Sequence, residues 1–103
     1  MNYLKINEVY TFKLVSGEEL TAKLIHYHSD DGAFEVSQPI SMILGQQGLQ
    51  MMPSLFSSNS DKNVYINTAS IAMAAETRDD VRNKYVEATT GIVTPSAKQI
   101  ITG

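Results

Sequence analysis

Two histidines and an aspartate have the residue types and spacing of a possible metal site. His26, His28 and Asp30 lie two residues apart, so on an extended strand they share one face. Imidazole nitrogens and a carboxylate are donors that bind zinc and other divalent cations. No further ligand is implied nearby, so we expect exposed histidines at a strand end, with no metal ion and no cofactor.

Catalysis has little support in the sequence. The two histidines are the only candidate bases for a serine or threonine nucleophile, and cysteine is absent, which also excludes disulfides and thiolate zinc sites. Adjacent acids occur at expected turns or at a helix start, where carboxylates accept hydrogen bonds from backbone amides: Glu18-Glu19, Asp30-Asp31 and Asp79-Asp80. We therefore predict that the chain is not an enzyme.

A second candidate patch consists of Arg78, Arg82 and Tyr85. The three residues follow one another at about one helical turn. Guanidinium groups beside an aromatic ring can bind phosphate and stack on a base. Two other interpretations stay open: a solvated helix face, and Tyr85 as the residue that docks the helix on the rest of the fold.

Alternation of apolar and polar residues predicts the strands that position these side chains. Glu8–Ser16 and Leu20–Leu24 alternate with period two and are joined at Gly17, which predicts an antiparallel hairpin. A polar turn at Ser29–Gly32 then leads to a long strand from Phe34 to Leu44. Pro39 interrupts that strand, and because proline cannot donate to a ladder, it predicts a bend, a bulge or an edge position.

The alternation weakens between Gly45 and Asn63. Gly45–Gly48 is a turn, Leu49–Met52 could extend a strand, and the serine-rich Ser54–Asn63 resembles a mobile insertion. We expect a long loop over residues 45–63. Two short strands follow, at residues 64–66 and 71–75, with Asn67–Ser70 as the corner between them.

The period changes after Glu76, which predicts a helix over residues 77–91. Thr77 is the expected N-cap, and Val81, Tyr85 and Ala88 form one apolar stripe. Residues 92–103 contain Pro95 and no regular period, so we expect a tail or docking arm. The expected organisation is a β domain over 1–76, a helix over 77–91 and a tail over 92–103.

Length and charge restrict the class of protein. The chain has 103 residues, 43% of them hydrophobic, and a net charge of −3. These values are typical of a single globular domain and argue against a general polyanion binder, which is normally basic. The longest apolar run, Ile71–Ala75, is far shorter than the ~20 residues of a membrane span. Since Met1–Glu8 does not resemble a signal peptide, we expect a cytoplasmic protein that does not bind membranes.

Two segments resemble the two sequence motifs of the Sm-like (Lsm) family. Phe12–Leu24, with its glycine at position 17, is similar to the start of the first motif, and Val64–Met73 is similar to the second. The similarity covers about residues 8–76 and is interrupted by the 45–63 segment. It implies a mainly β fold, a five-stranded, strongly bent antiparallel SH3-like or Sm-like barrel, here followed by a C-terminal helix.

The resemblance also implies a site for single-stranded RNA. Tyr27 falls at the family's aromatic position and His28 at its RNA-contacting aspartate, while a short shift would place Asp30 there. Asn67 replaces the base-stacking arginine, and Thr68 replaces the glycine beside it. The implied pocket is lined by these five residues, although most of the residue types that hold bases are replaced.

The family further implies a homo-oligomeric ring, usually of about five to seven subunits, in which the fourth strand of one subunit pairs with the fifth of the next. Ring closure would remove the unpaired strand edges of a small open barrel. Two alternatives stay open. One is a protein-interaction ring that does not bind RNA and uses Ser54–Asn63, the helix and the tail. The other is an SH3-like monomer that binds peptides.

Overall fold

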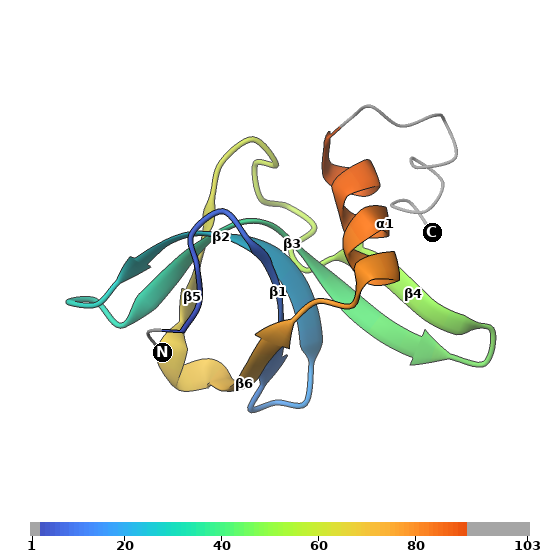
Figure 1. The fold of residues 1–103 in the computed structure, drawn as a ribbon, viewed down its shortest axis with the longest axis horizontal. Coiled ribbons are helices and arrows are strands. Elements are labelled where there is room, and N and C mark those ends of the chain that lie inside the picture. Colours follow the sequence, from blue (N-terminus) through green and yellow to red (C-terminus); the bar gives the residue numbers. More distant parts are fainter. Residues whose placement is uncertain (1–2, 91–103) are drawn as a thin grey trace.

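Six strands and one α-helix make up the part of the chain that the computed structural model describes, residues 3–90 (Figure 1). The elements are β1 Val9–Leu14, β2 Glu19–His28, β3 Ala33–Gly45, β4 Gly48–Pro53, β5 Val64–Asn67, the 3-10 helix η1 Thr68–Ser70, β6 Ile71–Glu76 and α1 Asp79–Thr90.

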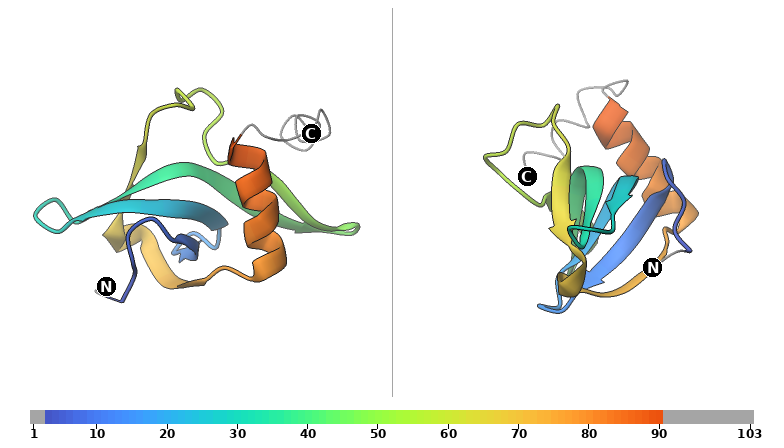
Figure 2. Two further views of the ribbon diagram at one scale, coloured as in Figure 1. Left: turned by 45° about the horizontal axis from the view of Figure 1, so that its top comes forward. Right: turned by 90° about the vertical axis from the view of Figure 1, so that its left-hand side faces the viewer.

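The strands form one antiparallel sheet in the order β4-β3-β2-β1-β6, and β5 pairs with β3 outside this path. The long strand β3 therefore has two partners: β5 along Ala33–Val36 and β4 along Ile40–Gly45. Within residues 3–90, β5 and β6 do not pair with each other, so the curled sheet is not closed into a barrel (Figure 2). The mainly β, antiparallel class is confirmed.

The predicted hairpin and its apolar face are confirmed. β1 pairs with β2 in antiparallel register, and Gly17 in the turn has a positive φ of 94°, which glycine adopts without strain. The alternating apolar residues of β1, β2 and β3 share one core with the first residue of β6. Its buried members are Tyr10, Phe12, Leu20, Ala22, Leu24, Phe34, Val36 and Ile71.

The bend predicted at Pro39 is also confirmed. Gln38 has a positive φ of 47°, and the β2–β3 register shifts between Thr21 and Lys23, so that two residues of β3 oppose one of β2. Beyond the bend, β3 leaves the first core. Its residues Ile40 and Met42 pack in a second core with Val81 and Tyr85 of α1.

Tyr85 joins the helix to the sheet at this bend. Its side chain is only 3% exposed. Its hydroxyl donates to the Ser37 carbonyl at 2.6 Å and accepts from the Lys23 backbone N–H at 3.1 Å. Lys23 and Ser37 are cross-strand partners, so the hydroxyl is inserted between two strands next to the bulge. Burial raises the pKa of Tyr85 to about 12, so the hydroxyl stays protonated and able to donate well above neutral pH.

The helix begins later than the sequence predicts. α1 starts at Asp79, and the Arg82 N–H donates to the Arg78 carbonyl. Thr77 is therefore not the N-cap. It is buried, and its hydroxyl lies 3.0 Å from that of Thr11 on β1. This buried hydroxyl pair connects the chain just after β6 to β1, so the Thr77 side chain does not cap the helix. Gly91, the expected C-terminal residue of the helix, lies outside the described residues, as does the predicted tail.

The expected long loop over 45–63 is partly wrong. Gly48–Pro53 forms β4, which pairs with β3 in a hairpin that projects from the body of the domain (Figure 1). The alternation indicated Leu49–Met52 only as a possible strand, since among the larger apolar side chains of β4 only Met51 packs against the second core. The fold therefore has six strands where we expected five.

The remaining loop, Ser54–Asn63, is tethered to the sheet. The Ser54 N–H donates to the Pro39 carbonyl, and the Gln38 side chain donates to the Ser60 carbonyl. Asn63 donates to Glu35 on β3. These bonds hold both ends of the segment that we expected to be mobile.

No helix among the described residues has the length and apolar character needed to cross a membrane.

Replacing Tyr85 with Phe tests the junction between helix and sheet. The variant leaves the Lys23 N–H and the Ser37 carbonyl without their partner, so we expect a loss of about 1–3 kcal/mol in the free energy of unfolding. Chemical denaturation followed by circular dichroism measures the loss. The matched control is Tyr65→Phe, at an exposed side chain on β5, where we expect a change within about 0.5 kcal/mol. Equal stability of the two variants would contradict this role of the hydroxyl.

Candidate nucleic-acid interface

The β2–β3 turn brings together segments that are far apart in the sequence. Two backbone hydrogen bonds close the turn. The Asp31 N–H donates to the His28 carbonyl, and the Gly32 N–H donates to the Ser29 carbonyl. Thr68 then anchors η1 to it, because both its backbone N–H and its hydroxyl donate to the Gly32 carbonyl, at 2.8 and 3.0 Å. The corner between β5 and β6 is thereby fixed beside the turn.

Four of the five residues implied by the Sm-like resemblance lie at this junction. His28 ends β2, Asp30 is exposed in the turn, and Asn67 and Thr68 lie at the corner. Ala33 pairs with both His28 and Asn67, which places these two residues on strands that flank the start of β3. The alignment therefore selects residues that the fold brings together.

Several of these side chains are already engaged. Tyr27 packs inward against Phe34, with ring centroids 5.1 Å apart, and belongs to the edge of the first core. The side-chain oxygen Oδ1 of Asn67 accepts from the Ala69 N–H and caps η1. The hydroxyl of Thr68 is bound to Gly32. Of the five implied residues, His28 and Asp30 have side chains that neither pack in the core nor hold this corner.

A side-chain network on the outer face of β2, β3 and β5 was missed by the sequence analysis. The Nε2 atom of His28 lies 2.8 Å from Oε1 of Glu35, and the Asn63 amide donates to Oε2 of the same carboxylate at 2.7 Å. Three rings adjoin the network, because the ring of His28 lies 4.6 Å from that of His26 and 5.7 Å from that of Tyr65.

The sequence contained part of this signal. Alternation along the third strand places Glu35 opposite to Phe34 and Val36, and therefore on the outer face of that strand. The pairing of Glu35 with His26 and with Tyr65 depends on the strand register. The register shift between Leu24 and His26 cannot be read from the alternation alone.

The network holds a carboxylate in its charged form. Hydrogen bonding to His28 is the largest influence that lowers the pKa of Glu35, and the bond from Asn63 is the next. A charged Glu35 fixes the orientation of both partners. The exposed rings of His26 and Tyr65 are left as flat apolar surfaces on which a planar ligand could stack.

The three candidate metal ligands weighed in the sequence, His26, His28 and Asp30, do not converge. Among residues 3–90, no three His, Asp or Glu side chains lie close enough together to hold a metal ion. Asp30 lies in the turn, and the carboxylate that contacts His28 is Glu35.

The second candidate patch, Arg78, Arg82 and Tyr85, does not form one surface. Tyr85 is buried, and its hydroxyl is bonded on both sides, so its ring does not face solvent beside the arginines. Of the alternatives that the sequence leaves open, docking of the helix is the one observed for this residue. Arg78 pairs with Asp80 through Nε at 2.5 Å and through a second guanidinium nitrogen at 3.0 Å. Arg82 is exposed on the first turns of α1.

Replacing His28 with Ala tests the network through Glu35. We expect the pKa of Glu35 to rise toward its ordinary value of 4.5 in the variant. Because folding lowers this pKa, the contribution of the network to stability is present above about pH 4.5 and is lost as pH falls through the lowered value. An NMR titration of the Glu35 side chain measures the change. The control is His26→Ala, whose charge is the smallest influence on Glu35, and an equal rise in both variants would contradict the assignment.

Comparison with known proteins assigns no family to the chain. Its sequence matches no protein-family model, and a search of curated proteins finds no significantly similar sequence. The Sm-like resemblance therefore stays a prediction that rests on the residues quoted above.

Proposed function

We propose that the chain is a non-catalytic, Sm-like binding module that assembles with copies of itself into a closed ring and binds single-stranded RNA. The observation that carries the proposal is that β5 and β6 each have an open edge; β4, the other end strand of the sheet, also has one. Among residues 3–90, β5 pairs only with β3, and β6 pairs only with β1. With β4 counted as part of the 45–63 insertion, these are the fourth and fifth strands, the two that the resemblance implies pair between neighbouring subunits.

The side chains of both edge strands support this assembly. Tyr65 on β5 is 62% exposed, and Met73 on β6 is 66% exposed. An open edge with exposed apolar side chains is a site for pairing with another chain. Because β5 and β6 are different surfaces, their pairing is heterologous, and it generates a ring when the rotation between subunits closes.

The outer face of β2, β3 and β5 supports RNA as the ligand. Bases stack on aromatic rings without requiring a particular sequence, and the rings of His26, His28 and Tyr65 adjoin one another there. A ring would repeat this face in every subunit. With a net charge of −3 per chain, we expect contacts at these local faces only, since the overall field repels phosphate.

A ring that binds protein and not RNA is the second candidate. It is favoured by the engagement of Asn67 and Thr68 in hydrogen bonds of the corner, and by the inward position of Tyr27. These contacts leave fewer free polar groups for reading a base than the alignment implies.

Native mass spectrometry tests the assembly. We expect the protein to form one species at about five to seven times the chain mass of 11.3 kDa. Tyr65→Glu and Met73→Glu place a charge at each edge and should give monomers, whereas Leu44→Glu, at an 82% exposed position near the tip of the β3–β4 hairpin, should keep the ring. A monomeric wild-type protein, or rings in both edge variants, would rule the assembly out.

Fluorescence anisotropy with a short uridine-rich RNA tests the ligand separately. We expect binding by the wild-type ring that weakens with added salt, and about tenfold or greater loss of affinity in the double variant His26→Ala/His28→Ala, because two stacking rings are removed. Gln46→Ala, in the β3–β4 turn, is the control and should bind like wild type. A wild-type ring that does not bind RNA would leave the assembly intact and support the protein-binding candidate.

A further inference from the structure

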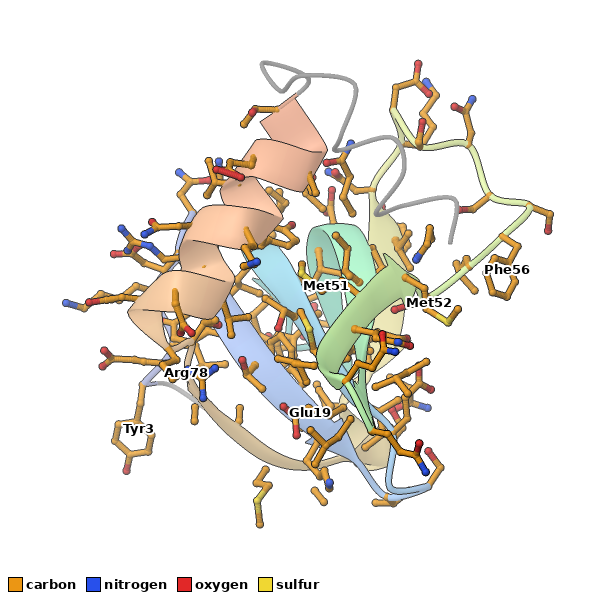
Figure 3. All side chains as sticks on the ribbon, turned by 90° about the vertical axis from the view of Figure 1, so that its right-hand side faces the viewer. Tyr3, Glu19, Met51, Met52, Phe56 and Arg78 are labelled. Carbon is orange, nitrogen blue, oxygen red and sulfur yellow. The ribbon has the colours of Figure 1, made fainter. Side chains whose placement is uncertain are left out.

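An apolar groove lies on the side of the domain away from the β2–β3 turn. It has a volume of about 360 Å³ and is formed by β4, the Ser54–Asn63 loop and the C-terminal end of α1. Met51, Met52 and Phe56 line it from β4 and the loop, as Figure 3 shows, and Ala88 and Thr89 line it from the helix.

The groove is held in shape by the sheet. The bonds from Ser54 to Pro39 and from Gln38 to Ser60 hold the loop against the bend in β3, and this volume is typical of ligand sites. Three of its apolar side chains nevertheless face solvent: Met52 is 37% exposed, Leu55 49% and Phe56 81%. Adjacent exposed apolar side chains of this kind mark a surface that another segment covers.

The sequence beyond the described helix supplies a segment of matching character. Thirteen residues, Gly91–Gly103, follow Thr90, and they include four large aliphatic residues and a single charged one: Ile92, Val93, Ile100, Ile101 and Lys98. Ile92 is three residues beyond Thr89, which lines the groove. An extended chain of that length reaches about 10 Å, so the first aliphatic pair is tethered close to the groove.

We propose that the chain's own C-terminal segment, Gly91–Gly103, binds in this groove, with Ile92 and Val93 covering Met52 and Phe56. Tethering favours this occupant over others, because a short linker gives an effective concentration in the millimolar range. An apolar peptide from another protein, or the segment of a second copy, must displace it. The groove is thus a site that the protein covers itself, whether or not the chain forms a ring or binds RNA.

Disulfide trapping in the full chain tests the contact. The chain has no cysteine, so any disulfide of a double variant joins introduced cysteines, within one chain or between two. We expect Met52→Cys/Ile92→Cys to form an intramolecular disulfide under mild oxidation at least about tenfold faster than the matched pair Leu44→Cys/Ile92→Cys. Leu44 is exposed on the same hairpin but does not line the groove. Equal rates in the two pairs would overturn the proposal.

The mass of the trapped product identifies the occupant. Under denaturing, non-reducing conditions the proposal requires the mass of one chain. A two-chain product in which the cysteine introduced at position 52 of one chain is joined to that at position 92 of another, identified by peptide mass mapping, shows that a second copy fills the groove, and it would overturn binding by the chain's own segment.

A second variant tests the contact without cysteines. In the full chain, Ile92→Asp/Val93→Asp places two charges where the proposal requires apolar contact. We expect the backbone amide signals of Met52 and Phe56 to shift in NMR spectra, while those of Gly17 and Val15, in the β1–β2 turn, stay unchanged. Unchanged signals for Met52 and Phe56 would contradict the proposal even if the cysteine variants failed to fold.

Discussion

The arrangement of this domain depends on the two hydrogen bonds that the Tyr85 hydroxyl makes with the sheet. At the bend in β3, two residues of that strand oppose one of β2, and Pro39 has no N–H to offer the ladder. The tyrosine hydroxyl accepts from Lys23 and donates to Ser37, so it completes the pairing from outside the sheet. Because both bonded groups lie in the backbone, the helix is positioned by the bend itself, and the second core forms around that contact.

The bend in β3 separates two surfaces of the molecule. Before it, β3 pairs with β5 and presents Glu35 beside His28 and Tyr65; beyond it, β3 pairs with β4 and forms the floor of the apolar groove. Without the bend, β3 would not contribute to both surfaces. The proposed ring uses the edges of β5 and β6, while the groove lies beside α1, so one small domain has separate surfaces for assembly, for a ligand and for its own C-terminal segment.

The alternation of apolar residues was sufficient to predict the first hairpin, the bend at Pro39 and the core face of the helix, because these depend on neighbours in the sequence. The strand Gly48–Pro53 was indicated only as a possible strand over Leu49–Met52, because little of it is buried, and Thr77 was misassigned because its partner, Thr11, is distant in the sequence. The same distinction between local and distant contacts applies to the candidate site. The alignment found His28 and Asn67, whereas the contact of His28 with Glu35 depends on a register that only the folded sheet defines.

Hydrogen exchange of the Lys23 amide tests the central claim most directly. In the wild-type protein this amide donates to Tyr85, so its exchange should be slow and should require the helix to leave the sheet. In Tyr85→Phe we expect exchange at Lys23 to accelerate by about tenfold or more beyond the general acceleration seen at Phe12, in the first core, since the bond removed is local. Equal acceleration at Lys23 and Phe12, or none at either, would contradict the account of a bend held by one tyrosine hydroxyl.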